Sequence, residues 1–413
     1  MPPHHTPVVI LGAGLQGSCV ALELAGRGID VVLVDQDEIP MNRASLRNEG
    51  KIHLGLVYAN DRTLATATLV LQGALYFHYL LAKWLGSAID QLSYSIPFAY
   101  LVATDSLLTA DELAKHYSAV ESEYHRRLVQ QPELNYLGKR PEQLYRRLNS
   151  KELAIHFQPS RFQAGFHTEE LAVDTEQLAI LLRQAITLSP GIRFLPSRRV
   201  KTVERVNGLF RVEGIGDEGV WQIEAQQVVN ATWESRLAID HHIGLECMDG
   251  WVYRLKYRVI ARLPESLRDA PSVTMVIGRY GDVVIRPNGT VYLSWYPLAL
   301  QGWSHDLQPP ASWDAPCRGQ VAQHQARELA VRILAAVDSW FPGMGKSEPF
   351  LVDAGVIFAY GRTDVDNTTS GLHDRTKIGV TSVDGYHSID TGKLTTAPLF
   401  ALSVADRVMD WLR

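Results

Sequence analysis

Hydrophobic and polar positions along the first half of the chain predict alternating strands and helices. Residues 8–11 and 31–34 are short apolar runs typical of buried strands, and the segment between them has the length of one helix. Residues 109–127 and 173–186 carry apolar side chains at helical spacing behind capping residues. Residues 65–85 form a longer and more strongly apolar stretch.

The pattern changes to short strand-like runs in the middle of the chain. Between residues 251 and 297 these runs are separated by turn residues such as Pro287, Asn288 and Gly289, which predicts a mainly antiparallel sheet. Further strands are expected over residues 96–104, 192–206, 220–232 and 377–383, and helices over residues 319–340 and 398–411.

The turn between the first strand and the first helix carries glycines at a spacing that suits a bound dinucleotide. Gly12 permits the tight turn, Gly14 lets the backbone approach a pyrophosphate, and Gly17 lets the helix and strand pack closely. Asp35 ends the second strand, where a carboxylate can accept hydrogen bonds from a ribose diol. A glycine-rich turn in an ordinary α/β protein is the alternative. The residues predicted to contact the nucleotide here are Gly12, Gly14, Leu15, Gln16, Gly17, Asp35 and Gln36.

Composition narrows the classes of protein that the chain can belong to. The formal net charge of −5 over 413 residues disfavours a broad basic face for nucleic acid. The three cysteines are scattered and show no zinc-like spacing, so neither a disulfide framework nor a metal site is expected. The sequence runs directly into the first strand without a basic segment or a cleavage site, so a reducing, cytoplasmic setting is expected.

The apolar stretch at residues 65–85 has two interpretations. Its length would suit a transmembrane helix, but Gln72, His78 and Lys83 interrupt it. We therefore expect a buried amphipathic helix and no transmembrane segment.

Two further segments suggest which dinucleotide is bound. A nicotinamide enzyme with this fingerprint would usually continue as βαβαβ, whereas here Asp35 is followed by the polar loop SLRNEGKIHLG. This loop and the carboxyl-terminal run GYHSIDTGKLTTAP resemble the FAD-dependent oxidoreductases of the D-amino acid oxidase superfamily. Within it, KIHLGLVY and TGKLTTAP are most similar to the branch of glycerol-3-phosphate dehydrogenase and L-2-hydroxyglutarate dehydrogenase.

The resemblance implies an α/β fold, α+β overall, in which a Rossmann-like FAD-binding domain carries an inserted, mainly antiparallel substrate domain. The FAD-binding domain is predicted to be discontinuous and to comprise residues 1–64, 160–240 and 346–413. Residues 65–159 and 241–345 are predicted to form the substrate-binding or cap domain.

The resemblance also implies cofactor contacts outside the fingerprint, with FAD bound non-covalently because Cys317 does not lie in a known attachment motif. Asn48 as a turn former, Val200 as a core residue and Lys393 as a solvated charge are the alternatives. The implied contacts are Ser45, Asn48, Gly50 and Lys51 at the pyrophosphate, ribityl chain and flavin edge, Val200 at adenine, Ala231 and Thr232 beside the ADP half, and Gly392, Lys393, Leu394 and Thr395 at the flavin pyrimidine.

Three residues are candidates for the chemistry of the substrate. His53 and, second, His387 are candidate general bases, because imidazole titrates near neutral pH. Arg375 is in the position of a family arginine that faces substrate, and its guanidinium could hold a carboxylate or phosphate; a structural salt bridge is the alternative. Ile357 and Phe358 stand where the glycerol-3-phosphate group carries an Arg-Pro pair, which argues against phosphate recognition.

The sequence thus predicts an FAD-dependent dehydrogenase or oxidase that takes a hydride from a CH–OH group of a small polar substrate. Oxidation of a CH–NH group, as in amino-acid or amine oxidases, is the alternative within enzymes. A flavin-binding protein without redox turnover is an alternative of another class, and NAD(P) binding is a fourth. The electron acceptor, whether oxygen, a quinone or a carrier, stays open.

Overall fold

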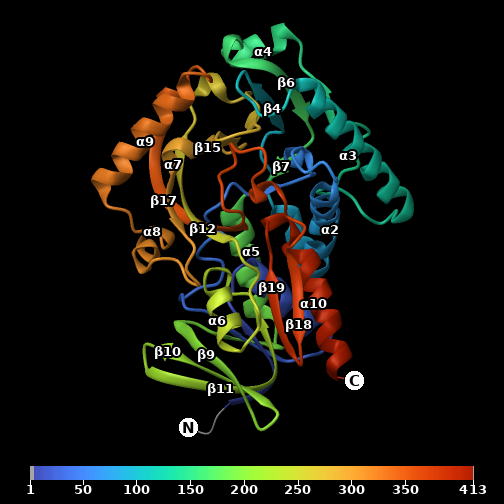
Figure 1. Ribbon diagram of the computed structural model, residues 1–413, viewed down its shortest axis with the longest axis vertical. Coiled ribbons are helices and arrows are strands. Elements are labelled where there is room, and N and C mark those ends of the chain that lie inside the picture. Colours follow the sequence, from blue (N-terminus) through green and yellow to red (C-terminus); the bar gives the residue numbers. More distant parts are fainter. Residues whose placement is uncertain (1–3, 413) are drawn as a thin grey trace.

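A computed structural model describes residues 4–412, and its amino-terminal strand lies inside a largely parallel sheet. The strand order is β18-β19-β11-β1-β2-β8, with β18 antiparallel to β19 and all other neighbours parallel. The hairpin of β9 and β10 extends from β11 at the lower end of the molecule in Figure 1. These strands are β1 (His4–Leu11), β2 (Val31–Val34), β8 (Ile192–Leu195), β9 (Arg198–Val206), β10 (Leu209–Gly216), β11 (Gly219–Asn230), β18 (Gly379–Val383) and β19 (Tyr386–Asp390).

Alternation along β1 divides the core of this sheet between its two faces. Val8 and Ile10 pack into a cluster with the helices, whereas Val9 and Leu11 pack on the opposite face with residues of β9, β10 and α6. Both sets are fully buried, which explains why the sequence shows a continuous apolar run at these positions. The helices of this domain are α1 (Leu15–Gly26), α2 (Ala65–Leu85), α5 (Thr175–Leu188), α6 (Arg236–His242) and α10 (Ala397–Leu412).

The second sheet is mainly antiparallel and occupies the upper part of Figure 1. Its order is β16-β12-β15-β14-β13-β4-β6-β5, in which β16 and β15 pair with the first and second halves of β12. β17 also pairs with β12, along its whole length. The strands are β4 (Phe98–Ala103), β5 (Tyr145–Arg147), β6 (Phe162–Thr168), β12 (Trp251–Arg262), β13 (Ser272–Val276), β14 (Gly281–Ile285), β15 (Thr290–Trp295), β16 (Leu300–Ser304) and β17 (Glu348–Tyr360).

Helices cover this sheet from two sides, and a small ribbon joins it to the first domain. The covering helices are α3 (Ala110–Gln130), α4 (Ser150–His156), α7 (Tyr296–Ala299), α8 (Asp314–Cys317) and α9 (Gln323–Asp338). Thr109 caps α3 in a reciprocal capping box with Glu112, as its sequence predicts. The ribbon pairs β3 (Lys51–Ile52) with β7 (Leu171–Ala172), so that the polar loop after Asp35 ends between the two sheets.

The mixed α/β fold and the inserted sheet are confirmed, but three elements differ from the predicted domain ranges. β6 and β17 belong to the second sheet, although residues 160–240 and 346–413 were predicted to lie in the FAD-binding domain. Helix α2, predicted to belong to the cap, packs mainly against α10 of the first domain, and also against α1 and α5 of that domain and α3 of the second. These elements belong to their domains because of strand pairing and helix packing between segments that are distant in the sequence. The local sequence pattern does not show these contacts.

Helix α2 continues into a short turn up to Gln91 and is the one candidate membrane span, by length and composition, among residues 4–412. Over half of its apolar window is buried, in agreement with the predicted buried helix. Val70, Ala74 and Phe77 are fully buried in the same cluster as α1 and α10. A cytoplasmic location stays a prediction.

Gly73 of α2 provides a test of this packing. A Cβ atom at position 73 would lie 2.9 Å from Cγ2 of Thr396 and 3.0 Å from the carbonyl oxygen of Thr395. We expect Gly73→Val to lower the free energy of unfolding by about 1–3 kcal/mol through overpacking, as measured by urea denaturation. Gly26→Val is the matched control, because a Cβ at the end of α1 meets no atom within 4 Å. Equal effects of the two substitutions would contradict the close packing of α2 on this loop.

Candidate active site

A cavity of about 330 Å³ lies between the two sheets and is lined by the residues that the sequence assigns to the cofactor. It begins at the glycine turn after β1 and runs past the polar loop to the segment before α10. All of the predicted cofactor residues line it except Gly17, Gly50 and Thr395.

The glycine turn brings the start of α1 to the cavity. Gly12 has φ +92° and its amide donates to the carbonyl of Val34, so the chain turns sharply between β1 and α1. A Cβ at position 17 would lie 1.8 Å from the Gly12 carbonyl oxygen, so Gly17 acts by allowing close packing and not by contact with a ligand. No side chain at Gly14 caps α1, and the Leu15 amide donates to Ser45 Oγ at 2.8 Å. This uncapped helix start can bind an anionic group.

Asp35 is held at the end of β2 by backbone amides. Its Oδ2 accepts from the Ala13 amide at 2.5 Å, and its Oδ1 accepts from the Asp37 amide at 2.9 Å. Burial raises the pKa of Asp35 to about 6, although these two amides oppose the rise. The carboxylate keeps lone pairs for a ligand hydroxyl, as the fingerprint predicts.

The polar loop is shaped by its own side chains. Asn48 Nδ2 donates to the carbonyls of Ala44 and Ser45, and Asn48 Oδ1 accepts from the Gly50 amide. Asn48 thus stabilises the turn, which is the alternative role given for it above. Gly50 has φ +76°, and a Cβ there would lie 2.1 Å from the Val173 carbonyl oxygen. Gly50 therefore supports the loop without lining the cavity.

The far ends of the cavity hold the other predicted contacts. Val200 lies in β9 at one end, beside Ala231 and Thr232, which follow β11. A Cβ at Gly12 would lie 2.7 Å from the Ala231 carbonyl oxygen, so these two turns are in close contact. Arg43, which the sequence did not single out, closes this end through ion pairs with Asp37, Glu234 and Asp314.

The opposite end of the cavity is formed by Gly392, Lys393 and Leu394. This segment leads into a single helical turn (Leu394–Thr396), which continues into α10. No side chain caps the start of this turn. Thr395 points away from the cavity, because its hydroxyl accepts from the His53 amide and donates to the Lys51 carbonyl. Burial lowers the pKa of Lys393 to about 8, and the charge of Arg375 lowers it further.

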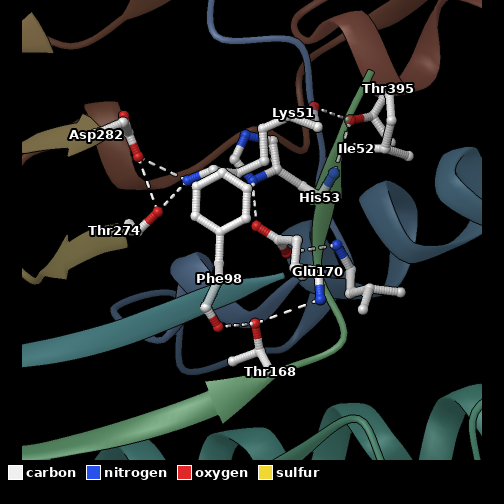
Figure 2. Close-up of polar contacts among 12 residues, drawn as sticks. Lys51, Ile52, His53, Phe98, Thr168, Glu170, Thr274, Asp282 and Thr395 are labelled. Carbon is white, nitrogen blue, oxygen red and sulfur yellow. Dashed lines mark hydrogen bonds and ion pairs between the residues drawn. The ribbon is translucent and has the colours of Figure 1, made fainter. Parts of the chain in front are cut away.

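Lys51 and His53 lie together where β3 meets the second sheet (Figure 2). The Lys51 ammonium pairs with Asp282 at 2.6 Å and donates to Thr274 Oγ1, and it lies 4.4 Å from the centre of the Phe98 ring. Lys51 thereby ties the loop to β13 and β14. Its charge is compensated within the protein.

His53 lies beside a buried carboxylate that the sequence did not reveal. Its Nδ1 is 3.3 Å from Glu170 Oε1, but neither ring nitrogen is aligned for a hydrogen bond with a described residue. Glu170 also accepts from the Tyr100 hydroxyl and the Leu54 amide. Burial lowers the pKa of His53 against the opposing effect of Glu170, which favours the neutral imidazole.

Arg375 lines the same end of the cavity and is not the structural salt bridge of the alternative interpretation. Within residues 4–412 its guanidinium makes no ion pair, and its Nη1 donates to the Phe358 carbonyl at 3.4 Å. The Arg375 amide donates to Thr66 Oγ1 of α2, which fixes the backbone at this position. A buried, unpaired guanidinium at a cavity wall is suited to bind an anion.

His387 as a second candidate base is wrong, because its side chain does not reach the cavity. Alternation along β19 directs Tyr386 and Ser388 to Asp240 on one face, whereas His387 points to the other. There His387 contacts Gln227 and Ser382 through its two ring nitrogens. Burial lowers the pKa of His387 to about 4, as is typical of an imidazole with a structural role.

Strand β12 carries basic residues at the cavity that the sequence analysis did not single out. Arg254, Lys256 and Arg258 share one face of this strand, with spacing i, i+2, i+4, while Tyr253, Leu255 and Tyr257 pack into the core beneath α9. Arg254 and Lys256 line the cavity. Three basic residues at alternate positions of an otherwise apolar strand were the signal available in the sequence.

A Rossmann-like unit whose glycine turn opens onto a cationic cavity is the arrangement of a dinucleotide-dependent oxidoreductase. The family model described as FAD dependent oxidoreductase, DAO, matches residues 7–407. The chain therefore belongs to the DAO family of FAD-dependent oxidoreductases and is an enzyme of that class.

A curated relative is similar to part of the chain, and several solved structures are similar to almost all of it. The tRNA 5-methylaminomethyl-2-thiouridine biosynthesis bifunctional protein MnmC of Marinobacter nauticus is 36% identical over 89 residues, which are 21% of this chain and 14% of that protein. The chain thus matches a small part of this relative's length.

The structural similarities extend over almost the whole chain. Glycine oxidase from Geobacillus kaustophilus has a TM-score of 0.69 at 17% identity and covers 98% of this chain and 95% of its own. Iminodiacetate oxidase from Chelativorans sp. BNC1 has a TM-score of 0.65 at 19% identity, with coverage of 98% and 95%. L-alpha-glycerophosphate oxidase from Mycoplasma pneumoniae, with FAD bound, has a TM-score of 0.63 at 17% identity, with coverage of 99% and 95%. These likenesses establish the fold.

The cavity fits FAD by the properties of its own residues. The turn at Gly12 and Gly14 has no side chain on the path to the start of α1, and Asp35 offers a carboxylate at the end of β2. Lys393 provides a positive charge at the opposite end, where reduced flavin gathers negative charge. Gly12, Gly14, Asp35 and Lys393 are therefore residues that would hold the cofactor.

The glycine turn yields a direct test of cofactor binding. A Cβ at Gly14 would already lie 3.0 Å from Ser45 Oγ, so Gly14→Glu would bring a long side chain and a negative charge to the start of α1. We expect this variant to purify without FAD, as measured by visible absorption. Gly26→Glu, which adds the same charge at the other end of α1, should keep its FAD. Full flavin occupancy in Gly14→Glu would contradict the site.

Proposed function

We propose that this FAD-dependent oxidoreductase oxidises the CH–NH group of a small amine that carries a carboxylate. Bound FAD supplies the acceptor for the hydride. The protein supplies a cationic pocket, made chiefly by Arg375, that holds the carboxylate and orients the C–H bond. The observation that carries this proposal is Arg375, a residue that is 6% exposed and whose guanidinium has no acidic partner among residues 4–412.

The energetics of burial support a carboxylate ligand. An isolated charge in a protein interior costs several kcal/mol unless a counter-charge or hydrogen bonds compensate it. Arg375 has a single long hydrogen bond to a carbonyl, and Lys393 nearby adds a second positive charge. A planar carboxylate can accept two parallel N–H bonds from a guanidinium, which also fixes the orientation of the substrate.

The surroundings of His53 favour an amine over an alcohol. An alcohol needs a base for its O–H proton, whereas an amine can bind in its neutral form and needs little base. Both ring nitrogens of His53 are buried without a hydrogen bond to a described residue, and Nδ1 lies beside Glu170. Two of the similar structures, glycine oxidase and iminodiacetate oxidase, are also named as oxidases of amines.

Oxidation of a CH–OH group is the second candidate, and the pair of His53 and Glu170 favours it. A buried carboxylate behind an imidazole stabilises the imidazolium that forms when the ring accepts a proton. His53 is among the residues that line the cavity. The sequence resemblance to the glycerol-3-phosphate and L-2-hydroxyglutarate dehydrogenase branch, and the similarity to L-alpha-glycerophosphate oxidase, also support this candidate.

Anaerobic reduction separates the two candidates. The holoenzyme is mixed with amino acids, N-methylated amino acids and 2-hydroxy acids, and the loss of flavin absorption at about 450 nm is followed. The proposal predicts reduction by amines that carry a carboxylate and not by the 2-hydroxy acids. Reduction by hydroxy acids alone would establish the second candidate. Peroxide formation on admission of air then tests oxygen as the electron acceptor.

Arg375→Met tests the carboxylate contact. We expect kcat/KM for the best amino-acid substrate to fall about 30-fold or more, because one partner of a buried ion pair is lost. The FAD content should be unchanged. Arg362→Met is the matched control, since Arg362 is exposed and is not among the residues that line the cavity. Equal kinetics of Arg375→Met and the wild type would contradict the proposal.

His53→Gln measures whether the imidazole acts as a base. The amine proposal predicts a rate of flavin reduction within a few-fold of the wild type, as determined by stopped-flow absorption. If the enzyme oxidises alcohols, general-base catalysis predicts a loss of about 100-fold or more. A loss of that size with an amine substrate would refute the view that the amine needs no base from His53.

A further inference from the structure

A second arginine without a close counter-charge, Arg254 of β12, lines the cavity together with Arg375. It is 2% exposed, and its Nε and Nη1 are buried without a hydrogen bond to any described residue. The nearest carboxylate oxygen in an ion pair is Asp364 Oδ1, at 4.0 Å from Nη1. Burial lowers the pKa of Arg254, and the positive charge of Arg375 adds to this effect.

The neighbours of Arg254 on the same face of β12 are compensated. Lys256 lies 3.3 Å from Glu49 Oε2, and Arg258 makes two hydrogen bonds to Asp353 at 2.6 and 3.1 Å. Of these three buried basic residues, Arg254 is the one without a close acidic partner.

Within residues 4–412, the one acid that forms an ion pair with Arg254 already has another partner. Asp364 Oδ2 lies 3.0 Å from Arg279 Nε, which is a much better ion pair. The guanidinium of Arg254 lies 5.5 Å from the centre of the Trp303 ring, so an aromatic face supports one side of it. This arrangement holds the guanidinium in place and leaves its charge for another partner.

We propose that Arg254 binds a second carboxylate of the substrate, so that the enzyme acts on a small dicarboxylate. This inference rests on the proposed function in so far as Arg375 holds the first carboxylate. A single carboxylate shared by both arginines would leave one positive charge uncompensated in a buried site, whereas two carboxylates neutralise both. Arg254 is thus a specificity-determining residue, and it selects dicarboxylates over monocarboxylates of the same length.

Calorimetric titration of the holoenzyme with succinate and butyrate tests this selection. The two probes have four carbons each and differ in one carboxylate against one methyl group. The wild type should bind succinate at least about 30-fold more tightly than butyrate, as expected for one buried charge pair. Arg254→Met should abolish this preference by weakening succinate and leaving butyrate within about threefold. A loss of the same size for both probes, or for neither, overturns the inference.

Two further variants separate a specific contact from a general loss of charge or fold. Arg262→Met removes an exposed arginine from the same face of β12, at its far end, and should leave both affinities unchanged. Arg254→Lys keeps the charge and should restore part of the succinate affinity. If Arg262→Met weakened succinate as much as Arg254→Met, a general electrostatic effect would replace the proposed contact.

The failure of this inference is distinguishable from the failure of the proposed function. Succinate binding that depends on Arg254 supports the second carboxylate contact even if the enzyme proves to oxidise hydroxy acids. Oxidation of monocarboxylic amines with unchanged kinetics in Arg254→Met, together with equal binding of succinate and butyrate, overturns the second contact and leaves the proposed function in place.

Discussion

The burial of positive charge without internal counter-charge is the constraint on which the active site depends. Most cations around the cavity are paired with acids, as Lys51 is with Asp282 and Lys256 with Glu49. Arg254 and Arg375 have no such close partner in the described chain. Two buried guanidinium groups without close counter-charges lower the free energy of unfolding, and binding of an anionic ligand that neutralises them raises it. The buried charges therefore favour binding of an anionic substrate.

Each of the two sheets forms a different part of this site, because side chains alternate between the two faces of a strand. In β1, alternate residues enter two separate cores, so the strand is fixed on both faces and the glycine turn at its end is rigidly placed. In β12, one face enters the core beneath α9 and the other presents Arg254 and Lys256 to the cavity. The cofactor end is thus built by backbone geometry, and the substrate end by side-chain charge on a buried strand.

Local signals in the sequence were sufficient for the cofactor half of the enzyme. The glycine spacing, Asp35 and the capping residues Thr109 and Asp174 each depend on neighbours within a few residues, and the structure has the elements that they predict. Strand β17, Glu170 and Arg254 depend on contacts between distant segments, which one sequence does not display. His387 was misjudged because proximity to a motif does not determine on which face of β19 a side chain lies.

Comparison of an amino-acid substrate with its own amide tests the central claim most directly. The amide keeps the amine and the C–H bond and differs in the charge of the group that the arginines would hold. If Arg375 recognises a carboxylate, anaerobic flavin reduction by the amino acid should have a second-order rate constant about 30-fold or more above that of the amide. Equal rate constants for the two compounds would contradict the account.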